Sequence, residues 1–115
     1  MDPFALHPGV AETYGYIRDN VLERGVVDQA LKELCLRYVA EDPEVTDLTR
    51  FEGRERAALE WAHAIVWDSA QATDELWERL RSYFGDAELV DLGCAVGFAL
   101  GQDHFLRTLG HTGAS

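Results

Sequence analysis

The sequence predicts an all-α fold, a compact domain of five helices with a long, buried C-terminal helix. Apolar residues recur at steps of three and four along most of the chain, whereas strand-type alternation is weak everywhere. Glycine, proline, aspartate and threonine separate these periodic segments at positions where helices commonly begin or end. The 115 residues fit one domain, 1–115, and we expect an ordered core over about residues 7–110.

The chain is strongly acidic, with 10 Lys and Arg against 21 Asp and Glu, which gives a net charge of −11. Nucleic acids and anionic membrane surfaces are therefore unexpected partners, because both attract positively charged surfaces. The opening MDPFALHPGV has neither a basic segment nor an apolar segment typical of a secretion signal. We therefore expect a cytoplasmic protein.

The first two helices are expected to form an antiparallel hairpin after an extended, proline-containing start. A helix is predicted from about Gly9 to Arg24, because Gly25 follows in the position where helices often end. A second is predicted over residues 29–40, with Asp28 as its N-cap. The apolar stripe of this second helix consists of Leu31, Leu34, Cys35, Tyr38 and Val39.

Residues 41–51 interrupt the helical pattern and are predicted to be a long connection. A calcium-binding loop beginning at Asp42 would need glycine at its sixth position and glutamate at its twelfth. These positions hold Asp47 and Gly53, so no calcium site is predicted.

Two shorter helices are predicted next, over residues 53–67 and 74–84. Thr73 is the expected N-cap of the second, and Gly85 ends it. The residues expected to face the core are Ala58, Trp61, Ala62, Ile65, Trp77, Leu80 and Phe84.

The last helix is predicted to begin at its N-cap Asp86 and to end before Gly110, a length of about 35 Å. It is apolar on almost all sides, so we expect it to be buried. Gly93, Gly97 and Gly101 lie on one strip and would let another helix approach closely. The polar residues Asp91, Gln102, Asp103 and His104 exclude a membrane span.

The two cysteines, Cys35 and Cys94, fall within predicted helices. Cysteine is among the most frequently buried residue types, so we expect both to be reduced, small residues of the core.

Glu60 and His63 form a Glu-x-x-His pair, the local motif of di-iron sites in four-helix bundles. Such a site needs a second pair and two more carboxylates, but the chain offers one pair and Glu33 as the single helper. The alternative is a solvated Glu60 beside a locally hydrogen-bonded His63. We therefore predict neither a metal nor a cofactor.

His104 is the first candidate for proton transfer, because it shares the glycine strip of the predicted buried helix. The alternative is a histidine satisfied within the core or an interface. Glu33 could be a carboxyl group in an apolar setting with a raised pKa. It could equally form a surface ion pair with Arg37, four residues further on.

Three segments resemble the carboxymuconolactone decarboxylase-like family, which includes the alkylhydroperoxidase D-like thiol enzymes. They are HPGVAETYGYIRDNVLERGVVDQALKELCLRYVAED, GRERAALEWAHAIV and TDELWERLRSYFGDAELVDLGCAVGFALGQDHFLRTLG, which together span residues 7–110. The resemblance implies an alkylhydroperoxidase D-like helical fold. It also implies assembly into dimers, trimers or hexamers, with pockets near subunit contacts.

In the thiol enzymes of this family a glutamate precedes a Cys-x-x-Cys motif and a histidine, and Glu33 matches that glutamate. Residues 41–51 stand where the motif would follow, and they contain neither cysteine nor histidine. Thiol peroxidase activity is therefore not expected, because it needs an attacking thiol and a resolving thiol.

Two functions are favoured by the sequence, and a third, a residual thiol or metal enzyme, would be revived by a Cys35–Cys94 disulfide or by stoichiometric iron or manganese. The first is acid/base catalysis on a small carboxylated or lactone compound, with His104 as the proton-transfer group, Glu33 as the second carboxyl and His63 in reserve. The second is a non-catalytic helical oligomer that binds a small hydrophobic ligand or a partner protein.

Overall fold

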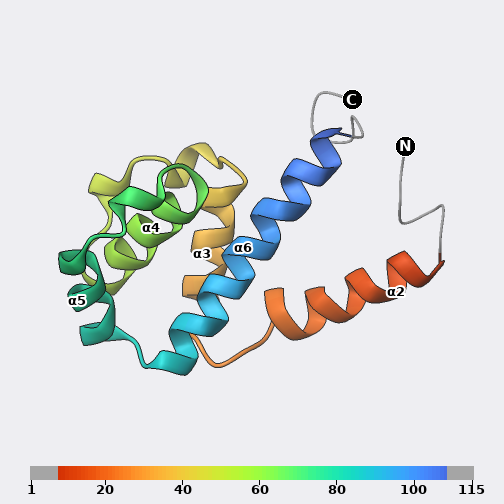
Figure 1. The fold of residues 1–115 in the computed structure, drawn as a ribbon, viewed down its shortest axis with the longest axis horizontal. Coiled ribbons are helices and arrows are strands. Elements are labelled where there is room, and N and C mark those ends of the chain that lie inside the picture. The colour runs from red at the N-terminus through yellow and green to blue at the C-terminus, as the bar shows by residue number, and fades with distance from the viewer. Residues whose placement is uncertain (1–7, 109–115) are drawn as a thin grey trace.

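The structure is a computed structural model that describes residues 8–108, and it confirms the all-α prediction (Figure 1). Its five α-helices are α2 (Pro8–Ile17), α3 (Gln29–Val39), α4 (Gly53–Val66), α5 (Asp74–Tyr83) and α6 (Asp86–Thr108). No strand occurs within these residues. The predicted start of the chain before residue 8, and the predicted end of the last helix at Gly110, lie outside the described residues.

The side chains expected to cap α3 and α5 do so. Asp28 accepts a hydrogen bond from the backbone N–H of Ala30 at 3.1 Å, and Thr73 accepts one from Leu76 at 3.2 Å. Asp86 is instead the first residue of α6, so its prediction as an N-cap is wrong. The Glu88 side chain caps the start of α6 instead, because its carboxylate accepts a hydrogen bond from the Gly85 N–H at 3.0 Å.

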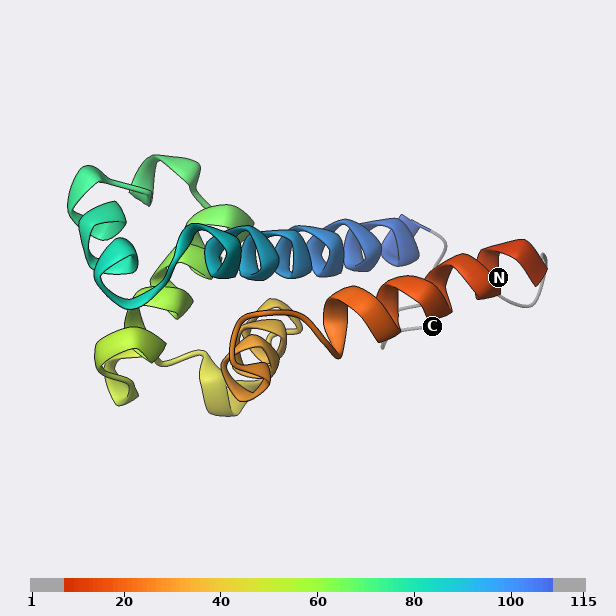
Figure 2. The same ribbon diagram turned by 90° about the horizontal axis from the view of Figure 1, so that it is seen from below.

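The predicted antiparallel hairpin is wrong, because α2 extends away from α3 instead of packing along it, and it passes into a π-helical turn, η1 (Arg18–Leu22) (Figures 1 and 2). The predicted connection after α3 contains two 3₁₀ turns, η2 (Pro43–Val45) and η3 (Leu48–Arg50). Asp42 caps the first and Asp47 caps the second, each accepting a backbone N–H. The aspartates that suggested a calcium loop therefore initiate turns.

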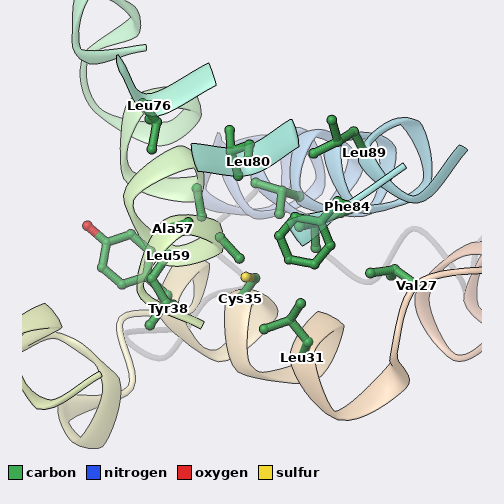
Figure 3. Close-up of a cluster of buried hydrophobic side chains, with 14 of the residues drawn as sticks. Val27, Leu31, Cys35, Tyr38, Ala57, Leu59, Leu76, Leu80, Phe84 and Leu89 are labelled. Carbon is green, nitrogen blue, oxygen red and sulfur yellow. The ribbon is translucent and has the colours of Figure 1, made fainter. Parts of the chain in front are cut away.

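The core lies where α3, α4, α5 and the first half of α6 meet (Figure 3). Alanines on α4 let the neighbouring helices approach closely, because Ala57, Ala58 and Ala62 are almost completely buried. The other core residues include Leu31, Cys35, Leu59, Leu76, Leu80, Phe84, Leu89, Leu92 and Val96. Burial raises the pKa of the Cys35 thiol to about 12, so this cysteine is the inert core residue that we predicted.

Burial of the long C-terminal helix on all sides is wrong for the single chain. Its fully buried residues, Leu89, Leu92, Ala95 and Val96, lie on one face of its first half. Ala99 and Leu100 still pack against the core, and the end of α6 extends beyond it, as α2 does (Figures 1 and 2). Cys94 is exposed, so its prediction as a core residue is also wrong.

The glycine strip of α6 has a close neighbour at one end only. A Cβ atom at Gly93 would lie 2.9 Å from the Trp61 indole of α4, so glycine is what allows this contact. Gly97 and Gly101 have nothing within 4 Å of the position of a Cβ atom. The prediction that another helix lies against the strip is therefore not met within one chain.

Candidate functional site

His63 of α4 is the predicted site residue that forms a hydrogen bond with a side chain of another helix. Its Nδ1 atom lies 2.5 Å from the hydroxyl oxygen of Tyr38 on α3, which is a hydrogen bond. The Tyr38 ring is buried at the edge of the core, and its hydroxyl group points away from the core (Figure 3). Apolar packing on α3 therefore positions the tyrosine, and the tyrosine positions the imidazole.

The pKa of Tyr38 is raised above its ordinary value. Burial is the main cause, and a hydrogen bond with Trp67 opposes it. The phenol therefore stays protonated at neutral pH, and it can either donate to Nδ1 or accept from it. Which of the two occurs depends on the tautomer of His63.

His63 lines a surface depression of about 230 Å³ together with Leu48, Arg56, Glu60 and Gln71. Both residues of the predicted Glu-x-x-His pair thus line this depression, but the Glu60 carboxylate forms ion pairs with two arginines. Its carboxylate lies 2.7 Å from Arg79 and 3.4 Å from the Nε atom of Arg56. Across residues 8–108, no three His, Cys, Asp or Glu side chains come together in a way that could hold a metal ion.

Arg56 contributes an unusual feature to this depression. One of its terminal nitrogens donates to the carbonyl oxygen of Leu48 at 3.0 Å. Its Nε atom is buried and has no hydrogen-bond partner among the described residues, although Glu60 is close enough for an ion pair. The Glu60 carboxylate is therefore an anion that this guanidinium already faces within the chain.

Glu33 and His104 lie elsewhere on the surface. Glu33 is exposed and lines a second depression, between α3 and the start of α4. His104 is exposed on the projecting half of α6, so the expectation that it is partly buried is wrong. Among residues 8–108, no hydrogen bond or ion pair joins any two of Glu33, His63 and His104. Their predicted cooperation stays a prediction.

The structure also contains a buried ion pair that the sequence analysis missed. Lys32 of α3 is completely buried, and its ammonium group lies 2.7 Å from an Asp91 oxygen on α6. The same ammonium group donates to the carbonyl oxygens of Val21 and Arg24, at 2.7 and 2.9 Å. One side chain thus joins α3, α6 and the segment that follows α2.

Asp91 completes this junction from the opposite side. Its second oxygen accepts hydrogen bonds from the backbone N–H groups of Val26 and Val27, at 2.8 and 2.9 Å. Burial, the largest single influence, raises the pKa of Asp91. The hydrogen bonds from Lys32 and the two backbone groups, together with the lysine charge, outweigh it, so the pKa lies below the ordinary value. All the donors are occupied within the chain, so we assign this pair a structural role.

The lowered pKa predicts how acid affects stability. The unfolded chain takes up the Asp91 proton more readily, so the stabilisation is complete above the unfolded value of about 3.9 and is lost as the pH falls through the lower folded value. In urea denaturation between pH 2 and pH 6, Asp91→Asn should show a weaker pH dependence of the unfolding free energy. The difference should not exceed about 1.4 kcal/mol per pH unit, the value for one proton. An unchanged dependence would contradict the assignment.

Comparison with known proteins gives no relative, since no family model, no curated protein and no solved structure matches the chain. No helix within residues 8–108 combines the length and the apolar character needed to cross a membrane. The resemblance to carboxymuconolactone decarboxylase-like proteins stays a prediction.

Proposed function

We propose that the protein is a cytoplasmic, homo-oligomeric member of the carboxymuconolactone decarboxylase-like group that transfers protons on a small organic acid or lactone. His63 is the proton-transfer group, and Tyr38 positions it. The observation that carries this proposal is the 2.5 Å hydrogen bond between the Tyr38 hydroxyl and Nδ1 of His63, beside a depression lined by polar groups.

The chemistry follows from the two nitrogens of the imidazole. Tyr38 occupies Nδ1, and Nε2 has no hydrogen-bond partner within residues 8–108, so Nε2 is the nitrogen left for a substrate. When Nδ1–H donates to the phenol, Nε2 is unprotonated and can act as a base. When the phenol donates to Nδ1, Nε2 carries the proton and can donate a hydrogen bond to a substrate oxygen.

The depression also suggests the size and the charge of the substrate. Its volume of about 230 Å³ is below the roughly 300–1,000 Å³ of sites that hold drug-sized ligands, which favours a small molecule. Arg56 lines the same depression, and its guanidinium favours a carboxylate, or the carbonyl oxygen of a lactone, as the substrate group. Acid/base catalysis does not use a thiol, so the proposed reaction is consistent with the inert Cys35.

The proposal is tested by following deuterium uptake from D₂O, and loss of carbon dioxide, in a panel of small unsaturated lactones and oxo-acids. His63→Gln should lower the rate about 100-fold or more, the usual contribution of a general acid or base. Tyr38→Phe should lower it less and should shift the pH profile, because the tyrosine acts through the histidine. Circular dichroism checks that each variant is folded.

His104→Gln and Glu33→Gln decide between the possible sites. Near wild-type rates in both would support the His63 depression. Loss of turnover in His104→Gln, with His63→Gln still active, would move the site to α6.

A non-catalytic helical module is the second candidate function. It is favoured by the uncharged outer surface of α6, where Gly97 and Gly101 have no neighbour within the chain. A folded wild-type protein that turns over no compound of the panel would support this candidate.

A further inference from the structure

Trp67, the C-cap residue of α4, has a side chain that lies mostly in solvent. It is 57% exposed, whereas Trp61 and Trp77 pack against each other with their ring centroids 5.6 Å apart. A tryptophan stabilises a core mainly by burying its ring, so core packing does not account for Trp67. Its side chain does form a hydrogen bond with Tyr38, the residue that positions His63.

The end of α4 places Trp67 beside the candidate site. Trp67 follows His63 by four positions, so the two side chains lie on the same face of the helix. The backbone N–H of Trp67 donates to the carbonyl oxygen of His63 at 2.8 Å and closes the last turn. Tyr38 approaches this turn from α3, and its hydroxyl group bonds to both side chains. The tyrosine hydroxyl therefore joins the indole to the imidazole.

The indole determines the direction of one of these two hydrogen bonds. An indole nitrogen can only donate, so the Tyr38 oxygen accepts from Trp67. Burial raises the pKa of Tyr38, and the hydrogen bond with Trp67 lowers it, as expected of a donor to the phenol oxygen. The Tyr38 oxygen therefore already has one donor before His63 is considered.

The proton of the Tyr38 hydroxyl group has one acceptor within residues 8–108, the Nδ1 atom of His63 at 2.5 Å. If Nδ1 carried a proton instead, the phenol oxygen would accept two hydrogen bonds and its own proton would have no acceptor there. Tyr38 is only 8% exposed, so water gives little compensation. Hydrogen bonding therefore favours the arrangement in which Tyr38 donates and Nδ1 accepts.

We propose that Trp67 is a positioning residue of the His63 site: its indole N–H holds the Tyr38 hydroxyl as a donor to Nδ1, so that His63 meets the substrate with an N–H group at Nε2. The inference rests on the proposed function for its role in catalysis. It selects one of the two tautomers that the Tyr38–His63 pair allows, and this selection is measurable without turnover.

An N–H group at Nε2 acts on an oxygen of the substrate. An oxo-acid that loses carbon dioxide leaves an enolate, and Nε2 gives its proton to the enolate oxygen. Nδ1 takes the Tyr38 proton in the same step, so the imidazole stays neutral, and water later returns a proton to the tyrosine. The negative charge passes to the tyrosine oxygen, where the Trp67 N–H stabilises it. A phenol is a weak acid, so the acceptor must be strongly basic, as an enolate is.

Nitrogen-15 NMR of the full chain with labelled histidine tests the arrangement without any substrate. At about pH 9, above the ordinary histidine pKa of about 6.5, Nδ1 of His63 should give the signal of an unprotonated nitrogen and Nε2 that of a protonated one. Trp67→Phe keeps an aromatic ring but removes the N–H donor, so it should give a mixture of both tautomers. His63→Gln identifies the signals by their loss.

Turnover tests the role in catalysis. Trp67→Phe should lower kcat about 3–10-fold, the usual contribution of one hydrogen bond between neutral groups. KM should not change, because Trp67 does not line the depression. The loss should disappear in the Tyr38→Phe background, because Trp67 acts through Tyr38. Trp77→Phe makes the same change at a tryptophan that stacks on Trp61, and it should keep the wild-type rate and tautomer.

Two NMR results would overturn the proposal, namely a proton on Nδ1 in the wild type and an unchanged tautomer in Trp67→Phe. An equal loss of rate from Trp67→Phe with and without Tyr38 would overturn the role in catalysis. A wild type that turns over no compound of the panel contradicts the proposed function instead, and the NMR measurement then still decides the hydrogen-bond arrangement.

Discussion

Lys32→Met is expected to lower the free energy of unfolding by about 3–5 kcal/mol, the usual cost of removing one partner of a buried ion pair. Methionine keeps most of the side-chain volume but supplies no donor. The Asp91 side chain, 13% exposed, would lose its cation. The carbonyl oxygens of Val21 and Arg24 would lose the ammonium hydrogen bonds of 2.7 and 2.9 Å. For a chain of this size the midpoint of thermal unfolding should fall by roughly 10–20 °C.

Arg37→Met is the matched control, because it lies on the same helix and removes a cation from exposed ion pairs with Asp42 and Glu44. Exposed pairs contribute about 0–1 kcal/mol, so this variant should unfold close to the wild type. Urea denaturation at pH 7 measures both. A loss in Lys32→Met that is no larger than in Arg37→Met would show that the buried pair does not hold the helices together.

Gly25→Ala is expected to destabilise the protein by about 2–4 kcal/mol, for two reasons that act together. The backbone of Gly25 has φ +156°, a conformation that residues with a side chain rarely adopt. A Cβ atom there would also overlap with the Asp91 carboxylate. The carboxylate would have to move away from the N–H groups of Val26 and Val27 that it binds.

Gly15→Ala, in α2, separates this effect from the general effect of alanine. Its nearest neighbour would be the Arg18 guanidinium at 3.8 Å, an ordinary contact. Alanine favours a helix over glycine by about 0.5–1 kcal/mol, so this variant should be slightly more stable than the wild type. Urea denaturation at pH 7 compares the two variants. Equal stability of the two would exclude a special requirement for glycine at position 25.

Helix positions could be predicted well because the signals for them are local. The predicted segments 29–40, 53–67 and 74–84 each lie within one residue of α3, α4 and α5. Asp28 and Thr73 mark two of the starts through hydrogen bonds that reach only two or three residues along the chain. Such contacts leave a readable pattern in the sequence.

The candidate site was predicted only in part, because its key contacts join residues far apart in the chain. The sequence predicts His63 as a candidate site residue but places Tyr38 in the apolar stripe of its helix, and 25 positions separate the two. The pair of Lys32 and Asp91, separated by 59 positions, had no motif to reveal it. One signal was present: Lys32 shares the helix face of Cys35 and Val39, where a charged residue needs a partner.

The exposure of α6 could not be predicted from its composition. An apolar pattern on all sides indicates that a helix is to be covered, but it does not say whether its own chain or another molecule covers it. In this chain Leu92 and Val96 are covered by the core, whereas Val90 and Phe105 are not. The same ambiguity led to the wrong placement of Cys94 and His104.

The junction between Lys32 and Asp91 also affects how the protein is made. Ribosomes add about 5–20 residues per second, so the 59 positions between the two residues correspond to a delay of about 3–12 s. During this interval the growing chain carries an ammonium group that has no carboxylate to meet, and the segment after α2 has no anchor. Assembly of α2 and the segment that follows it onto the rest of the fold must therefore wait until Asp91 has been synthesised.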